Sequence, residues 1–343
     1  MEIHVSVSAA ARLVPFQLAR PITDGLPAED IRACRAGRDF SSRVGTVLRR
    51  ALLGACLAAG AALAQEKDLD TPYVQTPQNV VDKMLEIARV GPGDTVIDLG
   101  SGDGRMVITA AKKYGARGFG VDLDPRLVKL SNANAAKAGV ANRAVFYARD
   151  LFDTDVSAAT VLTLYLLPDV NLAIRARLLA TLKPGTRIVS HDYDMGEWPP
   201  DFQMELAAPG KTVGVGQRSK IFYWMVPARA AGRWRWSLAP QGGSGGFELA
   251  LNQNFQKLEG TLRIAGRGTQ LEGAGLEGDR IRFAAAAGAG PSRTRYEFSG
   301  RIINHAIEGV ARVTRGGRTE ELAWNAARVE LWEPRHVGEG AAK

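Results

Sequence analysis

Val96-Ile97-Asp98-Leu99-Gly100-Ser101-Gly102-Asp103-Gly104-Arg105 is the stretch that decides the fold of this chain. Its first residues continue a short apolar run that begins at Thr95, which is typical of a buried parallel strand. A helical pattern from Arg105 to Tyr114 follows directly. The three glycines between the two elements leave room for the main chain to approach a ligand closely. This glycine-rich turn from a strand into a helix predicts a ligand site at the carboxyl end of the strand.

Strand and helix patterns alternate on both sides of this loop. Helices are expected at residues 77–88, 105–114, 125–138 and 169–182, and strands at 95–99, 118–121, 144–148, 159–166 and 187–190. Two further apolar runs, Lys211 to Val215 and Lys220 to Val226, have no helix between them and are expected to form an antiparallel hairpin. The pattern predicts an α/β fold with a Rossmann-like parallel sheet that ends in one antiparallel hairpin. This is the plan of class I methyltransferases and differs from that of a dinucleotide-binding dehydrogenase.

Two acids in the glycine loop indicate the kind of ligand that it binds. Asp98 and Asp103 would repel the pyrophosphate of a dinucleotide, but they would attract the ammonium and sulfonium groups of S-adenosyl-L-methionine (SAM). Asp122 follows the second strand and is predicted to accept hydrogen bonds from the ribose hydroxyls, whereas Asp124 caps the next helix.

A third strand end supplies one more acid. Asp150 suits the exocyclic amine of adenine, with Leu151 or Phe152 against the ring, and the alternative is a loop acid that faces water. The three acids that follow successive strands are expected to line one edge of the sheet. The predicted cofactor-binding residues are Asp98, Gly100, Ser101, Gly102, Asp103, Gly104, Asp122, Asp150 and Leu151.

Candidate acceptor-side residues flank the strands that feed the same edge. Tyr73 and Tyr165 are expected to line a methyl-transfer channel, and an acid such as Asp192 suits an incoming amine. His191 and Asp194 are further candidates on the acceptor side. The predicted catalytic residues are Tyr73, Tyr165, His191 and Asp192. The alternative for the segment from His191 to Asp194 is a hydrogen-bonded cluster at the end of a strand.

From Thr71 to about Asp201 the chain resembles class I SAM-dependent methyltransferases. Within them it resembles a lysine methyltransferase family that includes the mitochondrial enzymes acting on the adenine nucleotide translocase and on ATP synthase subunit c, with bacterial relatives. The matching pieces are the glycine loop, Thr71-Pro72-Tyr73-Val74, Tyr165-Leu166-Leu167-Pro168 and the segment from Lys183 to Asp192. The resemblance implies SAM as cofactor and a protein lysine as methyl acceptor.

Two other functions remain open at this point. One is methylation of a small molecule, and the other is a SAM-binding module without turnover. DNA amino-methylation is disfavoured because Leu164 to Pro168 lacks the Asn/Asp-Pro-Pro-aromatic tetrapeptide expected after the fourth strand.

We expect residues 71–228 to form a methyltransferase domain. Residues 233–333 have a different hydrophobic pattern. Period-two alternation runs from Trp234 and Trp236 to Leu322 and Trp324, with glycine-rich turns between the runs. This pattern predicts a C-terminal all-β domain, a meander or small closed barrel of about seven or eight antiparallel strands. Such a barrel could act as a structural cap, bind a small apolar ligand or contact a partner.

The first 64 residues resemble a leader. Arg49-Arg50, an uncharged run from Ala51 to Ala64 and the ending Ala62-Leu63-Ala64 predict a signal peptide at about residues 47–64. A start of translation near Val44 or Val47 would place it at the N-terminus, and the expectation is then an exported or envelope-associated protein. The alternatives are a lipoprotein signal ending at Cys56, a twin-arginine signal, and an alanine-rich helix on a cytoplasmic protein.

Charge and metal-binding residues narrow the possible partners. The formal net charge of +8 lies mostly in the first 50 residues and after residue 232, so the region with the candidate site is nearly neutral. A nucleic-acid partner is not expected, because such enzymes usually carry a basic face at the site. Membrane association is expected only through the leader. No metal is expected, since Cys34 and Cys56 precede the globular region and only His191 lies near the site.

Overall fold

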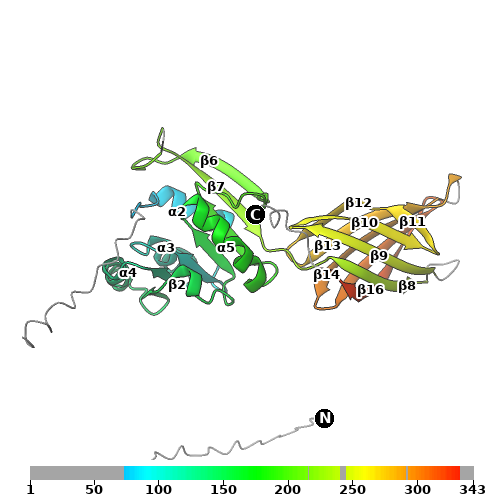
Figure 1. The fold of residues 1–343 in the computed structure, drawn as a ribbon, viewed down its shortest axis with the longest axis horizontal. Helices are drawn as coiled ribbons and strands as arrows, with labels where there is room; N and C mark the ends of the chain where they lie inside the picture. Colours follow the sequence, from blue (N-terminus) through cyan, green and yellow to red (C-terminus); the bar gives the residue numbers. More distant parts are fainter. Residues whose placement is uncertain (1–72, 215, 240–244, 291–292, 333–343) are drawn as a thin grey trace, which may run out of the picture. The chain divides into compact units, whose positions relative to one another are not determined.

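The computed structural model describes residues 73–332, apart from Val215, residues 240–244 and residues 291–292 (Figure 1). The predicted leader and its signal peptide lie outside the described residues. Among the described helices, none has the length and apolar character needed to cross a bilayer.

The first sheet has seven strands in the order β3-β2-β1-β4-β5-β7-β6. The strands β1 to β5 are parallel, and β7 pairs antiparallel with both β5 and β6. Their bounds are β1 (Thr95–Leu99), β2 (Arg117–Asp122), β3 (Ala144–Ala148), β4 (Val161–Leu164), β5 (Arg187–His191), β6 (Phe202–Ala207) and β7 (Arg218–Met225). The predicted Rossmann-like sheet with a terminal antiparallel hairpin is confirmed.

Helices cover both faces of this sheet. Side chains alternate along each strand, so that in β1 Val96 packs with α2 (Gln78–Ile87) and α3 (Arg105–Tyr114), while its neighbour Ile97 packs with α5 (Pro168–Thr181) on the opposite face. The helix α4 (Pro125–Lys137) packs against β3 together with α3. A single turn of 3₁₀ helix, η1 (Leu151–Asp153), follows β3.

The predicted strand from Lys211 to Val215 is wrong. The partner of β7 is β6, and the segment between these strands is a loop in which Thr212 and Val213 are exposed. The sequence does not reveal β6 because it is an edge strand, and several of its residues face solvent. Its sequence therefore contains no apolar run. Gly210 and Gly214 adopt positive φ angles of 80° and 88°, which break an extended conformation.

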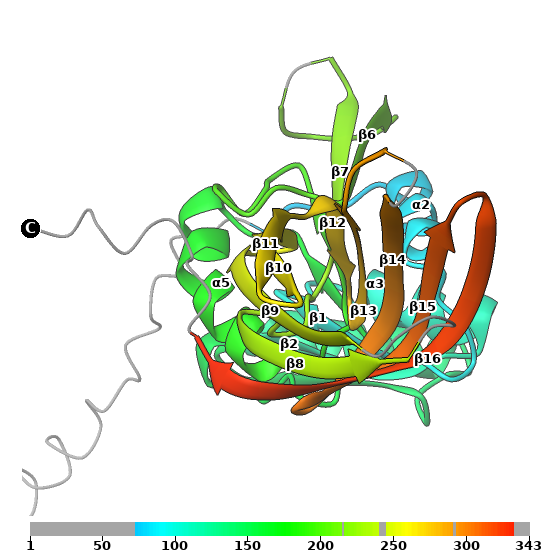
Figure 2. The same cartoon turned by 90° about the vertical axis from the view of Figure 1, so that its right-hand side faces the viewer.

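The second sheet closes on itself. Its strand order is β11-β10-β12-β13-β14-β15-β16-β8-β9, and β9 also pairs with β10, which closes a ring of eight strands with β11 attached to β10 (Figure 2). The predicted small closed barrel is confirmed. Its strands are β8 (Gly232–Leu238), β9 (Gly245–Asn254), β10 (Lys257–Ile264), β11 (Arg267–Gln270), β12 (Glu272–Glu277), β13 (Arg280–Ala287), β14 (Thr294–Ile303), β15 (Ala306–Arg315) and β16 (Arg318–Leu331).

Candidate cofactor and acceptor site

The glycine loop turns tightly at the carboxyl ends of β1 and β2. The backbone N–H groups of Gly100 and Ser101 both donate to the carbonyl of Val121 at 2.9 Å. Gly102 has a φ of 52°, and a Cβ atom there would lie 2.5 Å from the ring of Tyr73. Gly104, the N-cap of α3, has a φ of 82°. The loop therefore needs glycine at both positions, for backbone conformation and for the close approach of Tyr73.

Asp122 connects the end of β2 to this loop. One carboxylate oxygen accepts from the N–H of Gly102 at 2.9 Å, and the other accepts from the N–H of Asp124 at 3.0 Å. An ionised carboxylate has about four acceptor positions, so each oxygen can accept one more donor such as a ribose hydroxyl. Asp124 caps α4 by accepting from the N–H of Arg126, as predicted.

Asp98 lies deeper than the other acids of the loop. Its side chain is buried, and one oxygen accepts from the hydroxyl of Thr163 on β4 at 2.6 Å. Burial raises the pKa of Asp98 to about 7; the Thr163 hydrogen bond opposes this rise, and the charges of Asp122 and Asp103 add to it.

Asp103 has a cationic partner. Burial alone would raise the pKa of Asp103, but hydrogen bonds and the charge of Arg105 outweigh burial and lower it. The Arg105 guanidinium donates to both Asp103 oxygens and also to the carbonyl of Thr76 at 2.7 Å. Asp103 therefore stays ionised, and Arg105, held by Asp103, fixes Thr76 in the segment before α2 against the loop.

Asp150 caps η1. One of its oxygens accepts from the N–H of Phe152 at 2.8 Å, and the side chain of Phe152 is exposed. Asp150 follows β3, next to β2 in the sheet, so Asp98, Asp122 and Asp150 lie along one edge of the sheet.

The residues of this edge fit SAM. Arg105 pairs with Asp103, while Asp98 lies close enough to Asp122 and Asp103 for their charges to act on it, and this gathering of acids favours a cationic ligand. The hydroxyl of Ser101 is buried and has no hydrogen-bond partner among the described residues. An orphaned buried hydroxyl beside a cluster of acids is suited to a polar, positively charged ligand group.

The ends of β4 and β5 bring three of the predicted catalytic residues together. The rings of Tyr165 and His191 have centroids 4.0 Å apart, and the Tyr165 hydroxyl donates to Asp192 at 3.3 Å. Burial raises the pKa of Tyr165, and the charge of Asp192 raises it further, so the hydroxyl stays protonated. Asp192 has a φ of 63°, a strained conformation for a residue other than glycine.

His191 is enclosed by protein groups. Its Nδ1 lies 3.1 Å from the Thr76 hydroxyl, and its Nε2 lies 2.8 Å from the Ser219 hydroxyl. Burial lowers the pKa of His191 to about 4, with an opposing effect of Asp192, so the ring is neutral at pH 7. Both nitrogens are used inside the protein, which matches the alternative of a hydrogen-bonded cluster and makes His191 a positioning residue.

The other two acceptor-side candidates lie elsewhere. Tyr73 covers Gly102 and is 42% exposed, with its hydroxyl accepting from the Gln75 side chain at 3.1 Å. Its contacts place it at the cofactor loop. Asp194 is exposed and accepts from the N–H of Gly196, as a turn-forming side chain does.

Some residues of the site escaped the sequence analysis. Thr76, Thr163 and Ser219 contribute hydroxyls from three separate elements, and no local pattern brings them to Asp98 or His191. Lys211, which forms an ion pair with Asp192 at 2.6 Å, lies in a segment for which the sequence predicts a strand. The glycines at 210, 214 and 216 were the available signal for a loop there.

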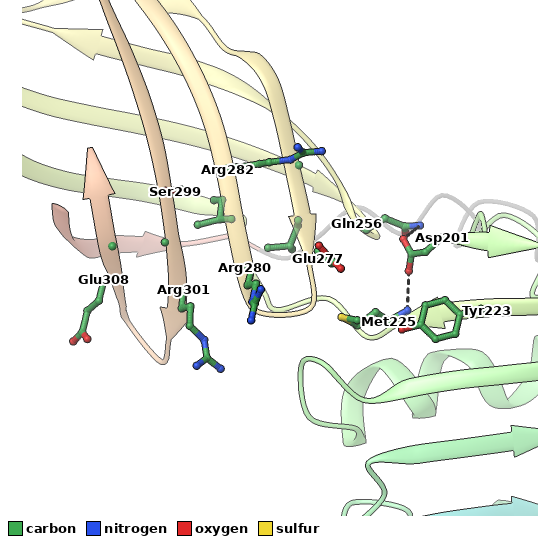
Figure 3. Close-up of a pocket in the computed structure, with 15 residues that line it drawn as sticks. Asp201, Tyr223, Met225, Gln256, Glu277, Arg280, Arg282, Ser299, Arg301 and Glu308 are labelled. Carbon is green, nitrogen blue, oxygen red and sulfur yellow. Dashed lines mark hydrogen bonds between the residues drawn. The ribbon is translucent and has the colours of Figure 1, made fainter. Parts of the chain in front are cut away.

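A cavity of about 830 Å³ lies away from this edge (Figure 3). Tyr223 and Met225 of β7 line it together with Asp201, which directly precedes β6, and Arg280 and Arg301 line it from the barrel. Asp201 accepts from the N–H of Met225 at 2.7 Å, the dashed line in Figure 3. None of its lining residues belongs to the cofactor or acceptor set. Within the described residues, no group of three or more His, Cys, Asp or Glu side chains is arranged to hold a metal ion.

Comparisons with known proteins place the same region in a family. The model of the ANTKMT methyltransferase domain matches residues 98–202. A protein-lysine N-methyltransferase of Saccharolobus islandicus is 45% identical over 130 residues, which are 38% of this chain and 81% of that protein. The adenine nucleotide translocase lysine N-methyltransferase of Mus musculus is 34% identical over 133 residues, which are 38% of this chain and 57% of that protein.

A solved structure also matches. It is an RNA methyltransferase from Salinibacter ruber in complex with S-adenosyl-L-homocysteine, with 50% sequence identity and a TM-score of 0.41. The match covers 45% of this chain and 94% of that chain.

The decisive comparison is the 45% identity that extends over four fifths of the Saccharolobus protein. The family model begins at Asp98, in the glycine loop whose geometry fits SAM. This chain therefore belongs to the family of class I SAM-dependent methyltransferases that includes the protein-lysine N-methyltransferase of Saccharolobus islandicus.

Proposed function

We propose that this protein transfers the methyl group of SAM to the side-chain amine of a lysine in a protein acceptor. The observation that carries the proposal is Asp192, a carboxylate held beside Tyr165 at the end of β5. It lies at the sheet edge where the cofactor loop ends, and it is suited to bind a lysine ammonium. The named relatives act on protein lysines, which supports the same acceptor for this chain.

Each part of SAM is assigned to one or two of the residues described above. When bound, SAM supplies an electrophilic methyl group on a sulfonium sulfur. We assign the attraction of its cationic groups to Asp98 and Asp103, the ribose hydroxyls to Asp122, and the adenine to Asp150 and Leu151. Tyr73 covers the glycine loop and limits the access of water to it.

The acceptor side must bind an ammonium and then favour its neutral form. Asp192 attracts the lysine as a cation and so opposes the loss of its proton, whereas the half-buried ring of Tyr165 provides an environment of low polarity that favours the neutral amine. The proton passes to solvent water before the amine attacks. Alignment of the amine and the exclusion of water account for most of the expected rate gain. His191, neutral and fixed by two hydroxyls, holds the Tyr165 ring in place.

The direct test uses SAM with a labelled methyl group and the full chain. Protein, RNA and lipid fractions of a bacterial extract serve as separate acceptors, and acid hydrolysis of labelled protein identifies the methylated residue. Methyl-lysine in the protein fraction is the expected product. Label found only in RNA, lipid or small molecules would contradict the proposal.

Replacement of Asp192 with asparagine should raise the KM for a lysine-containing acceptor by about tenfold, because the ammonium loses its ionised partner. Transfer rates measured against acceptor concentration separate this effect from a change in kcat. Asp155→Asn is a matched control, since Asp155 is exposed and also accepts from a backbone N–H, that of Ser157. An unchanged KM in Asp192→Asn would exclude Asp192 as the amine-binding group.

The raised pKa of Asp98 predicts a pH dependence of SAM binding. Below about pH 7 the buried carboxyl is protonated, and binding a cation there requires that this proton leaves. The dissociation constant for SAM should therefore fall as pH rises from 5 to 7, by up to about tenfold per unit. It should then level off, until the amine of SAM loses its own proton near pH 8.

Calorimetric titration with SAM at several pH values measures this dependence. Asp98→Asn keeps the shape of the side chain and cannot titrate, so its affinity should be lower and should change little between pH 5 and 7. An equally steep pH dependence in Asp98→Asn would assign the titration to another group.

A further inference from the structure

Lys211 has a buried side chain, which is unusual for lysine. The side chain is 5% exposed, whereas that of Lys113, which pairs with Asp82 at the same 2.6 Å, is 51% exposed. Burial of an ammonium is costly unless it is paired and hydrogen-bonded. Specific partners must therefore hold Lys211 inside the protein.

Two acceptors hold the Lys211 ammonium. Its Nζ lies 2.6 Å from a carboxylate oxygen of Asp192 and donates to the carbonyl of Arg218 at 2.6 Å. Asp192 is the group to which we assigned the amine of the acceptor lysine. An internal lysine thus already makes the contact proposed for an external one.

The remaining capacity of Asp192 is largely used. The oxygen paired with Lys211 also accepts from the Tyr165 hydroxyl at 3.3 Å, and the other oxygen accepts from the N–H of Lys220 at 3.0 Å. An ammonium from an acceptor lysine would have to lie beside the Lys211 ammonium at the same carboxylate. Two positive charges so close together repel strongly. The external lysine and Lys211 are therefore mutually exclusive.

The segment that carries Lys211 can leave without disturbing the sheet. Lys211 lies in the loop between β6 and β7, after the last residue paired in that hairpin. Thr212, Val213 and Gly214 in this loop are exposed, so few buried contacts oppose its displacement. Displacement would break the two contacts made by the Lys211 ammonium and the backbone hydrogen bond of Lys211 to Ala208, and it would expose the buried Lys211 side chain.

We propose that Lys211 is an internal competitor of the acceptor lysine, whose ammonium occupies Asp192 until a protein substrate displaces it. This inference rests on the proposed function. The apparent affinity for an acceptor is then reduced by the fraction of molecules in which the site is open. Lys211 thus favours acceptor proteins whose other contacts with the enzyme are strong enough to displace it from Asp192.

The first measurement is the reactivity of Lys211 toward an amine-acetylating reagent, followed by peptide mass spectrometry of the full chain with S-adenosyl-L-homocysteine present. Lys211 should react at least tenfold more slowly than Lys113, in proportion to the small fraction of open sites. A blocked pentapeptide with one dimethyl-lysine, which the reagent does not acetylate stably, should increase the labelling of Lys211. Equal labelling of Lys211 and Lys113 without peptide would overturn the proposal.

The second measurement is methyl transfer to a blocked pentapeptide that contains one lysine. Lys211→Met keeps the length and apolar stem but removes the charge, and it should lower the KM by about tenfold with little change in kcat. Lys211→Arg retains a cation and should stay near the wild-type KM, and Lys113→Met is the control for loss of a paired lysine.

These outcomes separate the inference from the proposed function. A higher KM or an unchanged KM in Lys211→Met, with lysine transfer intact in the wild type, would make Lys211 a structural residue and overturn the inference alone. If neither the wild type nor any variant methylates the pentapeptide or protein lysines, the proposed function fails and the inference fails with it.

Discussion

Replacement of Asp122 with alanine should weaken the binding of SAM by about 100-fold. Two losses contribute. The ligand loses the carboxylate assigned to its ribose, and hydrogen bonds to charged groups contribute about 1.5–3 kcal/mol each. The loop also loses the acceptor for the N–H of Gly102, so its ligand-binding conformation is less well held. Together these losses correspond to about 3 kcal/mol, or about 100-fold in the dissociation constant.

Calorimetric titration of the full chain with SAM at pH 7.5 measures this effect. Asp122→Asn keeps one acceptor oxygen and should lose less affinity than Asp122→Ala. Asp155→Ala removes an exposed carboxylate from the loop between η1 and β4 and should bind SAM like the wild type. A dissociation constant for Asp122→Ala within threefold of the wild type, in a variant with unchanged circular dichroism, would remove Asp122 from the cofactor site.

The cofactor side of the site could be predicted because its residues belong to local patterns. Gly102 and Gly104 have the positive φ angles that a tight strand-to-helix turn requires. Asp124 caps α4 by accepting a hydrogen bond from the N–H of Arg126, two residues later. Each of these features depends on a few consecutive residues. The order of the strands then brings Asp122 and Asp150 to the same edge as Asp98.

The acceptor side depends on contacts that are distant in sequence. The hydroxyl of Thr76 lies 115 positions from His191, and their contact could not be inferred from either segment. His191 therefore looked available for a substrate, although protein hydroxyls occupy both of its nitrogens. The sequence around Lys211 predicts a strand because valine and threonine favour strands, whereas the pairing of β6 with β7 leaves Lys211 in a loop.

The alternation of the second sheet predicts its strands, but it leaves an open meander and a closed barrel as alternatives. Period-two patterns identify strands that have one buried face, and they are the same in an open meander and in a closed ring. The pairing of β9 with β10, which closes the ring, joins residues such as Leu249 and Leu262. Closure leaves an interior that buried side chains fill, among them the aromatic residues Trp234, Trp236 and Trp324.

Replacement of Trp324 with alanine should destabilise the barrel by about 3–5 kcal/mol, because it leaves a large cavity in a closed interior. Trp324 is fully buried, and its ring centroid lies 5.0 Å from that of Phe298, 5.5 Å from that of Phe283 and 5.6 Å from that of Trp236. Trp324→Phe is the matched control. It keeps most of the ring contacts, and the indole N–H has no partner among the described residues, so no hydrogen bond is lost.

The same variant tests whether residues 71–228 and 233–333 are separate domains, as we propose from the change of pattern near residue 232. Unfolding in guanidinium followed by circular dichroism should give a barrel transition that shifts to lower denaturant in Trp324→Ala. The affinity for SAM should meanwhile stay at the wild-type value, since the cofactor acids all lie in the first sheet or the loops that follow its strands. Loss of SAM binding together with the barrel, in a single transition, would mean that the two sheets form one cooperative unit. In that case the barrel would help to maintain the methyltransferase fold and would not be a separate domain.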